Sequence, residues 1–403
     1  MRILLTSIYP YFYLLLFFTI PFDDYVRALP NILLAVLVLA FPFVVKKDDF
    51  KKIRTVPILI FAGFCLYLVA NSYFSGRLEE DFTVIKKVML AIGLVVLYIP
   101  IQDFEKIKKA ILFSSFAAIV FSVINIVVLT NTISEFHFGS SPEVIESLLI
   151  DRLYLGFLCV LSILVSYNLL KPKFHPKNRY YLANIIINIL FLFLIVSKIS
   201  ILLLVFILLL RQMYGKHKKI RIPLLLLTAL VIVGLYFFGT TGVGGKKNPT
   251  ALQNFITNTT TWEVRSITWE CAFKTIENNT INWKGFGFYG TKDNLVSCYQ
   301  ETIQDTHKKD RFTLERYNTH NQFLDFYLST GIVGFLLFVT FLLVLFIKNK
   351  NSFFYTALLA SLALYCMFEN VFQRQMGAYY IGFILIILLS NKSVAQNKTI
   401  KEV

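Results

Sequence analysis

The sequence predicts an all-α, polytopic membrane protein, and both its composition and its apolar runs support this prediction. Of the 403 residues, 56% are hydrophobic and 16% are aromatic. Apolar runs of about twenty residues recur from end to end, the length that a helix rising about 1.5 Å per residue needs to cross a bilayer. A chain of soluble domains would not carry such runs, so that class of protein is excluded.

Hydropathy predicts about twelve membrane helices and one long polar loop late in the chain. We expect helices one to nine within residues 1–239, the loop at 240–319, the last three helices within 320–391, and a tail at 392–403. No internal repeat is evident, which weakly opposes the transporter folds that are built from repeats. The spans are expected at residues 3–20, 29–45, 56–74, 84–101, 109–130, 150–170, 180–197, 199–214, 222–239, 322–347, 352–370 and 377–391.

The net charge of +16 is explained by the connectors between the spans. Lys and Arg gather in alternate connectors, such as 46–54, 106–109 and 211–221, whereas the intervening connectors contain few basic residues. This positive-inside pattern predicts that both termini lie in the cytoplasm and that the long loop lies on the opposite side of the membrane. It gives no reason to expect a nucleic-acid partner.

The long loop at 240–319 differs in kind from the other connectors, because it is polar and carries all three Trp residues. From Trp262 to Asn278 the apolar residues recur at helical spacing, which predicts an amphipathic helix, and the glycines of Gly285 to Gly290 predict a turn. Cys271 and Cys298 share the loop and could form a disulfide in an oxidising compartment. No Cys or His spacing resembles a zinc site, so no metal is implied. We expect the loop to cap a cavity.

Polar residues at the membrane boundary are the candidates for chemistry. His320 precedes the tenth span; a neutral imidazole can accept a proton, although a lone histidine there is more often an interfacial anchor. Lys198 separates the seventh and eighth spans, where a charge either reaches the interface or faces a cavity with an anionic partner. Lys86 and Lys87 open the fourth span against the positive-inside rule, as interfacial anchors or as contacts to lipid phosphate.

Three further charged groups have a simple structural interpretation. Arg265 lies on the expected loop helix and, taken alone, resembles a solvated arginine. Arg152 follows Asp151 at the start of the sixth span, which is typical of a local ion pair. Glu369 and Arg374 lie close together near the eleventh span, and we interpret them as a structural pair.

Four short motifs follow one another over residues 265–334. They are an arginine followed by Trp and Ala, a glycine turn, a His-Asn pair before an apolar helix, and a Gly-Ile-x-Gly; here they are Arg265, Trp269 and Ala272, then Gly285 to Gly287, then His320 and Asn321, then Gly331 to Gly334. Together they resemble the O-antigen ligase and polymerase family of bacterial envelope glycosyltransferases, whose members have some twelve spans and a long periplasmic loop before the last few helices.

This resemblance implies transfer of a glycan from a polyprenyl diphosphate carrier to a sugar hydroxyl, with inversion and without metal or cofactor. It implies that His320 is the base and that Arg265 and Lys198 bind the diphosphate, with Asn321 and Lys87 as weaker substrate-binding candidates. The family usually has a Ser-Arg pair where this chain has Ser197 and Lys198, and lysine lacks the planar fork that grips a diphosphate. Asp325 and Glu315 are the alternative bases.

The leading expectation is a ligase of the bacterial inner membrane that attaches an O-antigen-type glycan to the lipid A-core of lipopolysaccharide, with its site facing the periplasm. The runner-up is a polymerase that extends the carrier-linked glycan. A flippase or other transporter of lipid-linked oligosaccharide is the alternative from a different class. The basic groups gather on one side of the membrane, which favours a one-sided active site over a transporter.

Overall fold

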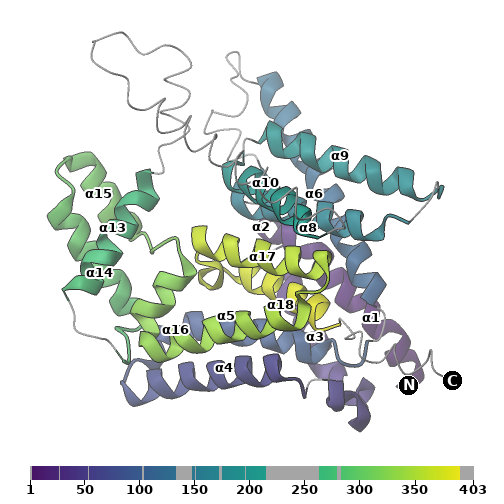
Figure 1. The fold of residues 1–403 in the computed structure, drawn as a ribbon, viewed down its shortest axis with the longest axis horizontal. Helices are drawn as coiled ribbons and strands as arrows, with labels where there is room; N and C mark the ends of the chain where they lie inside the picture. Colours follow the sequence, from purple (N-terminus) through teal and green to yellow (C-terminus); the bar gives the residue numbers. More distant parts are fainter. Residues whose placement is uncertain are drawn as a thin grey trace.

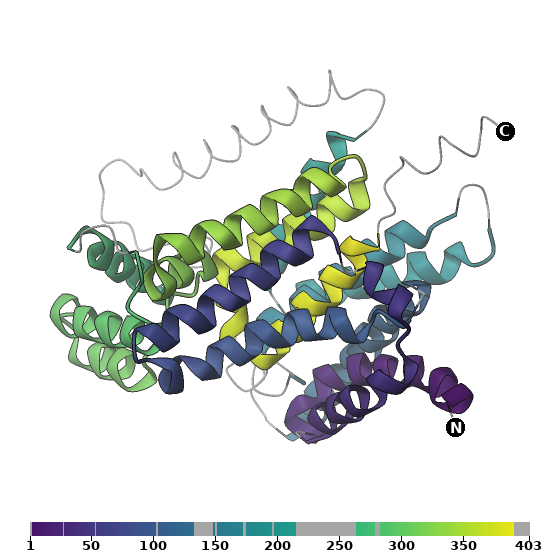
Figure 2. The same cartoon turned by 90° about the horizontal axis from the view of Figure 1, so that it is seen from below.

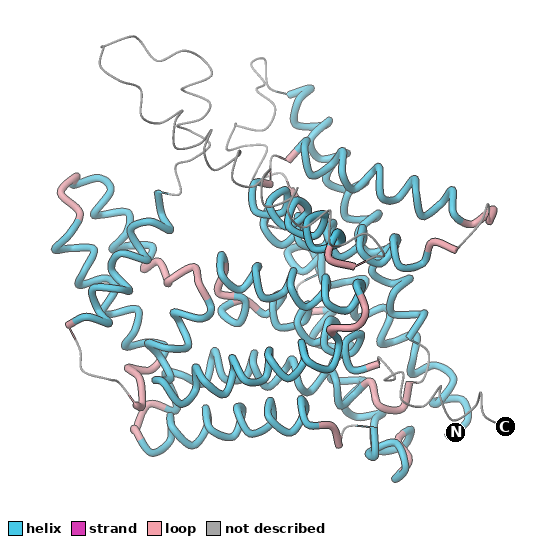
Figure 3. Tube along the Cα trace, in the orientation of Figure 1, coloured by secondary structure: helices cyan, strands magenta, loops and turns pink. Residues whose placement is uncertain are grey.

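The described part of the chain is helical and contains no strand (Figures 1 and 3). The all-α class is therefore confirmed for these residues. The predicted ninth span at 222–239 and the residue Trp262 lie outside them. The computed structural model describes residues 2–26, 28–52, 54–101, 104–132, 148–149, 151–171, 175–195, 197–214, 263–278 and 283–390.

Each of the other predicted spans coincides with a helix. Five helices in the described ranges are long and apolar enough to cross a membrane: Ile3–Phe22, Val56–Phe74, Glu105–Val128, Arg152–Leu169 and Gln322–Asn349. The bundle consists of α1 (Arg2–Thr19), α3 (Leu29–Val44), α4 (Val56–Phe74), α5 (Leu78–Leu97), α6 (Phe104–Thr132), α8 (Arg152–Leu169), α9 (Asn178–Leu194), α10 (Lys198–Gln212), α16 (Gln322–Asn349), α17 (Phe353–Phe368) and α18 (Gln375–Leu389).

The start of α5 differs from its predicted position. The helix begins at Leu78, whereas hydropathy places the span at 84–101. The added turn contains Glu79, Glu80 and Asp81, and carboxylates are favourable at a helix N-terminus because of the helix dipole. Hydropathy finds the apolar part of this helix and misses its polar first turn.

The burial pattern is that of a protein surrounded by lipid. The central helix is α18, in which every residue from Gly377 to Leu388 is buried. The outer surface is also apolar: Leu39 is 72% exposed, Leu66 is 70% exposed and Leu208 is 64% exposed. Apolar surface on this scale is unfavourable in water and suits acyl chains. The fold is therefore consistent with a polytopic membrane protein.

Three helices form a separate unit at one end of the bundle, beyond the ends of α4, α5 and α16 (Figures 1 and 2). We call α13 (Glu263–Glu277), α14 (Phe288–Thr302) and α15 (Thr306–Glu315) the loop unit. Helix α13 confirms the amphipathic helix predicted in the long loop. Leu295, Tyr299 and Phe312 are buried in a small core that the unit shares with Leu328 of α16.

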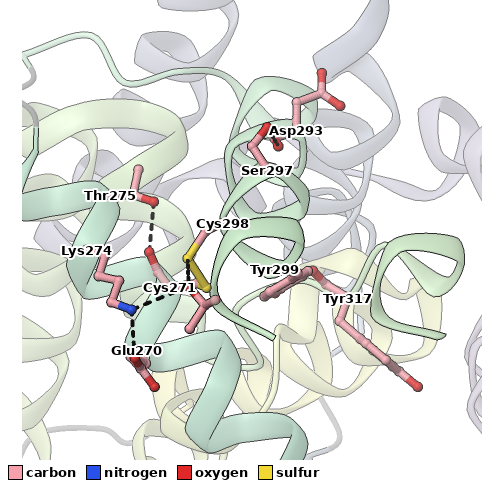
Figure 4. The surroundings of a disulfide bond; sticks show 10 residues. Glu270, Cys271, Lys274, Thr275, Asp293, Ser297, Cys298, Tyr299 and Tyr317 are labelled. Carbon is pink, nitrogen blue, oxygen red and sulfur yellow. Dashed lines mark hydrogen bonds and ion pairs between the residues drawn. A yellow bond between two sulfur atoms is a disulfide. The ribbon is translucent and has the colours of Figure 1, made fainter. Parts of the chain in front are cut away.

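A disulfide joins two helices of the loop unit. Cys271 on α13 bonds to Cys298 on α14, with a Cα–Cα distance of 5.7 Å (Figure 4). Next to it, Lys274 forms an ion pair of 2.8 Å with Glu270 on the same helix. The sequence left this disulfide open, and the structure contains it.

Helix α16 is broken where the loop unit docks. Gly331 has φ 73° and ψ −177°, a conformation that is almost confined to glycine. The break frees backbone carbonyls, and the neighbouring segments bind them. Phe286 N donates to Leu328 O at 2.8 Å and Gly287 N donates to Ser329 O at 2.9 Å. Two of the sequence motifs, the glycine turn and the Gly-Ile-x-Gly, therefore meet at one contact.

Candidate active site

The predicted site residues Arg265 and His320 come together where the loop unit meets the bundle, and the charge of Arg152 links Lys198 to Arg265. Lys198 is the first residue of α10, and His320 lies just before α16. Arg265, on α13, donates from Nε to Phe368 O at 3.0 Å, at the end of α17. The ring of Trp269, one turn further along α13, stacks on that of Phe368 with centroids 6.3 Å apart. Helix α13 therefore lies over the end of α17 and brings Arg265 into the bundle.

Glu369 links the predicted base to the predicted clamp. Its Oε2 atom lies 3.5 Å from His320 Nδ1 and 3.8 Å from Arg265 Nη2. The 3.5 Å contact is long for a hydrogen bond, but it points Nδ1 at the carboxylate. The Glu369 side chain is only 6% exposed, so its charge is held away from water beside these two groups.

The backbone around this cluster explains how it forms. Glu369 follows the last residue of α17 in an extended conformation, with φ −149° and ψ 144°, and so turns away from the helix axis. His320 has a left-handed backbone with φ 45°, and its N–H donates to Asn318 Oδ1 at 2.9 Å. Thr319 Oγ1 donates to Asn370 Oδ1 at 3.1 Å. Thr319 and Asn370, the neighbours of His320 and Glu369, thus tie the two segments together.

Several buried polar atoms around Glu369 have no hydrogen-bond partner. They are His320 Nε2, Trp269 Nε1, Asn370 Nδ2, and the hydroxyls of Tyr154 and Tyr365. Buried polar atoms are nearly always paired, and unpaired ones are commonly explained by a missing ligand or water. The atoms belong to α8, α13, the segment before α16, and the end of α17. A polar ligand bound between these elements would satisfy them.

Arg152 joins the two predicted diphosphate-binding residues electrostatically. Its charge acts on both Lys198 and Arg265. Gly156, one turn after Arg152 on α8, lies so close to Ser197 and Ser200 that a Cβ atom would overlap their side chains. This close approach of α8 and α10 brings Arg152 and Lys198 together. Arg152 therefore lies within electrostatic range of both Lys198 and Arg265.

Burial acts against the charge of Arg265, and Glu369 supports it. Burial lowers the pKa of Arg265, whereas the neighbouring carboxylate of Glu369 raises it. An arginine side chain remains protonated in proteins under ordinary conditions. Arg265 is therefore a fixed cation, and its environment favours a second anion.

Two ion pairs predicted from neighbouring residues interact through their charges, and their closest direct contacts are made elsewhere. Arg374 Nη1 binds Asp151 Oδ2 at 2.9 Å, while the charge of Glu369 also acts on Arg374. Asp151 caps α8 by accepting from Leu153 N, and its carboxylate contacts Arg374 directly, while its charge also acts on Arg152. Sequence proximity suggested both pairs, and the docking of helix ends from distant parts of the chain brought Arg374 and Asp151 into direct contact.

The weaker candidates lie elsewhere. Asn321 Oδ1 accepts from Phe323 N at 3.0 Å and from Leu324 N at 3.1 Å, so it caps α16. Lys87 Nζ donates to Gln373 O at 2.5 Å, near the end of the turn that joins α17 to α18 and opens with Glu369. Lys87 therefore contacts a different part of this turn from the part that Arg265 contacts.

The alternative bases are also apart from His320. Asp325 is buried and lies 3.3 Å from Gln373 Nε2 and 3.4 Å from Gln322 Nε2, both suited to hydrogen bonding. Glu315 is exposed at the end of α15. Within the described ranges, no group of three or more His, Cys, Asp or Glu side chains could hold a metal ion.

Sequence reasoning missed Glu369 and Arg152 as members of this cluster. Glu369 lies 49 residues from His320 in the sequence and more than 100 residues from Arg265. The one available signal was a carboxylate, Glu369, at the end of an apolar helix. Because Arg374 is the nearest basic residue in the sequence, Glu369 was paired with it. Arg152 was assigned to Asp151 for the same reason.

Comparison with known proteins gives a match to a family model. A search of curated proteins found no match. Residues 183–339 match a family model described as O-antigen ligase, and this segment contains Lys198, Arg265 and His320. The match supports membrane glycosyltransferase function of the ligase or polymerase type. It thereby confirms the resemblance of this chain to the O-antigen ligase family.

Proposed function

We propose that the protein is an O-antigen ligase-like glycosyltransferase that moves a glycan from a polyprenyl diphosphate carrier to a hydroxyl of the lipid A-core. The observation that carries the proposal is the contact of His320 Nδ1 with Glu369, beside Arg265, while His320 Nε2 is buried without a partner. A base, its orienting carboxylate and a cation are thereby assembled at one end of a membrane bundle.

His320 acts as the general base. With Nδ1 facing the Glu369 carboxylate, the proton of the neutral ring is favoured on Nδ1, and Nε2 keeps its lone pair. The acceptor hydroxyl approaches Nε2 and loses its proton there as its oxygen attacks the anomeric carbon. Glu369 also stabilises the imidazolium that forms. Correct positioning of such a base contributes about 10²- to 10⁴-fold to a rate.

The fixed cations stabilise the leaving group. As the new glycosidic bond forms, the bond from the anomeric carbon to the diphosphate oxygen breaks, and the diphosphate leaves with the electron pair. Arg265, Arg152 and Lys198 face the developing charge, and cations that are already oriented stabilise it most effectively away from water. Attack from the face opposite the leaving group inverts the anomeric carbon. Lys198 supplies a point charge where an arginine would supply two parallel donors.

The proposed arrangement in the cell follows the charge pattern. We place the protein in the bacterial inner membrane with some twelve spans, both termini in the cytoplasm, and residues 240–319 as a periplasmic loop that caps the active-site cavity. The positive-inside pattern supports this orientation. The neighbouring charges on the helix ends at the loop unit support a site that opens on this one side.

The test is a transfer assay with purified protein in liposomes, a polyprenyl diphosphate-linked glycan, and core lipid as the acceptor. We expect glycan on the core lipid with wild type and a loss of at least about 100-fold with His320→Ala. His307→Ala is the matched control, because His307 is an exposed histidine on α15 of the same loop unit.

Three results would contradict the proposal in different ways. Transfer that survives His320→Ala would remove His320 as the base. Elongation of the carrier-linked glycan without modification of core lipid would make the protein a polymerase. Movement of the carrier across the bilayer without any glycosidic bond formation would make it a transporter.

A further inference from the structure

A second group of cations lies on the other side of the turn that joins α17 to α18. We call Lys86 and Lys87 of α5 and Lys292 of α14 the lysine cluster. Lys87 Nζ donates to Gln373 O at 2.5 Å, and the charges of Lys86 and Lys292 both act on Lys87. The turn thus has two charged sides: its first residue, Glu369, faces Arg265 and His320, and Gln373 faces the lysine cluster.

The carboxylates near the cluster are engaged by other groups. Asp325 lies within hydrogen-bonding distance of the side-chain amides of Gln373 and Gln322, and the charge of Lys292 acts on it. Asp81 accepts from Phe288 N at 2.7 Å and from Ser72 Oγ at 2.9 Å. In the part of the chain that the structure describes, neither carboxylate forms a direct ion pair with a lysine or an arginine. The three lysines therefore exceed the nearby negative charge.

Such a cluster is unfavourable unless an anion occupies it. Three like charges close together repel one another, and the repulsion grows where burial lowers the local dielectric constant. Lys87 and Lys292 are half-buried, which limits screening by water and salt. Lys86 and Lys87 also lie on the side of the membrane that the positive-inside pattern leaves poor in basic residues.

We propose that the lysine cluster binds a phosphate group of the acceptor glycolipid. This inference rests on the proposed function and assigns the two charged sides of the turn to the two substrates. The donor diphosphate lies with Arg265, Arg152 and Lys198, and the anion of the acceptor lies with Lys87 and Lys292. His320 and Glu369 belong to the donor side of the turn, where the two substrates meet.

Charge complementarity favours this assignment over a second donor site. The donor diphosphate already has three cations assigned to it, and Lys87 contacts the turn at Gln373 rather than at Glu369. An acceptor bound beside Lys292 would be held at the loop unit and at α5 together, because the N-terminus of α14 is fixed to α5 through Asp81. Its remaining sugars would extend toward the turn and His320.

The experiment compares two acceptors and three variants. Core lipid carrying its phosphate groups and the same lipid after phosphatase treatment are each offered to wild type, Lys292→Gln, Lys87→Gln and the control Lys309→Gln, all in phosphatidylcholine liposomes. Lys309 is a half-buried lysine on α15 of the loop unit. Loss of one charged hydrogen bond predicts a rise of about tenfold in the acceptor KM.

The expected pattern is specific. Lys292→Gln and Lys87→Gln raise the KM for phosphorylated core lipid, leave the donor KM unchanged, and have no effect with dephosphorylated lipid. Lys309→Gln matches wild type with both acceptors. Binding of phosphorylated core lipid, measured without donor, weakens in the same two variants.

Other patterns would overturn the inference. A loss that is equal for both acceptors would mean that the lysines support the fold, and a raised donor KM would return Lys87 to the donor site. Binding that is abolished by phosphatidylglycerol in the liposomes would assign the cluster to phospholipid headgroups. If wild type transfers no glycan but the two variants still bind phosphorylated core lipid more weakly, the proposed function fails while the anion site stands.

Discussion

The loop unit is attached to the bundle at two places that differ in chemistry. At α14 the contact combines backbone hydrogen bonds with apolar packing: Phe286 and Gly287 donate to carbonyls at the break in α16, Asp81 accepts from Phe288 N, and the Phe288 ring packs on that of Phe326. At α13 the contact is made by side chains, as Arg265 reaches Phe368 O and Glu369.

This difference gives the two attachments different roles, one in the stability of the fold and one in the reaction. Backbone hydrogen bonds and a glycine in close contact leave little room for movement, so the α14 attachment fixes where the loop unit sits. The α13 attachment contains charges and unpaired polar atoms, which are unfavourable for stability and suited to binding a substrate. Changes at α13 should therefore affect transfer more than stability, and changes at α14 should do the reverse.

The largest expected effect is at the α13 attachment. Glu369→Gln keeps the size of the side chain but removes the charge that orients His320 and balances Arg265. We expect the transfer rate to fall by about 10²- to 10⁴-fold, because a misoriented base is as poor as a missing one. Glu369→Asp should restore part of the rate.

The measurement is the initial rate of transfer in liposomes, with the thermal unfolding midpoint as the reference for stability. A positioning role predicts a large loss of rate with a small change in the midpoint. Glu369→Gln with a rate within tenfold of wild type would remove this carboxylate from the mechanism.

The next effect is at the α14 attachment. A Cβ atom on Gly285 would overlap the backbone of Ser329 and Thr330, and the φ of Gly285, +73°, is strained for any other residue. We expect Gly285→Ala to destabilise the protein by about 3–5 kcal/mol and to undock the loop unit. Thermal unfolding in detergent and protease sensitivity of the loop unit measure this.

Gly290→Ala is the matched control for that substitution. Gly290 lies inside α14, and its nearest neighbour for a Cβ atom is Phe286 Cβ at 3.6 Å, an ordinary contact. Alanine is favoured over glycine in a helix by up to about 1 kcal/mol, so this variant should be as stable as wild type or more stable. Equal losses in the two variants would contradict the close-packing argument.

A smaller effect is expected from the disulfide, which holds the two attachments in one unit. Cys271 and Cys298 are 27 residues apart, and closing a loop of this size is worth about 2–4 kcal/mol through the unfolded chain. Replacing both with Ser should lower the unfolding midpoint and allow Arg265 to move relative to α14, with a modest loss of transfer. A double variant with an unchanged midpoint would show that the core of the loop unit is sufficient without the bond.

The sequence predicted the parts of the molecule that depend on local pattern. Apolar runs located the helices, including α18 in the centre, and helical spacing located α13. The start of α5 escaped because its first turn is acidic. The sequence marked Gly331 only as part of a motif and did not predict the break in α16. The carbonyls freed by the break accept hydrogen bonds from Phe286 and Gly287, which lie more than 40 residues earlier in the chain.

The candidate site was predicted as a set of residues and not as an arrangement. His320, Arg265 and Lys198 came from motifs and from the cost of a charge near a membrane. Glu369 was paired with Arg374 because the two are neighbours in the chain, whereas the extended residue after α17 turns it to His320. Partners of charged groups are set by which helix ends meet, and hydropathy contains no information about that.

The smallest predicted effect tests whether Asn321, which follows His320, only stabilises the fold or also binds the substrate. Asn321 Oδ1 accepts from two backbone N–H groups at the start of α16, so Asn321→Ala should cost about 1 kcal/mol of stability, as loss of an N-cap does, and Asn321→Asp should retain the cap. If capping is the whole role, transfer by Asn321→Asp equals that of wild type. If the amide nitrogen also binds a sugar hydroxyl, Asn321→Asp keeps the unfolding midpoint and loses transfer, because a carboxylate cannot donate that hydrogen bond. The second result would show that Asn321, next to His320, both caps α16 and binds the substrate. A single side chain would then contribute to stability and to the chemistry.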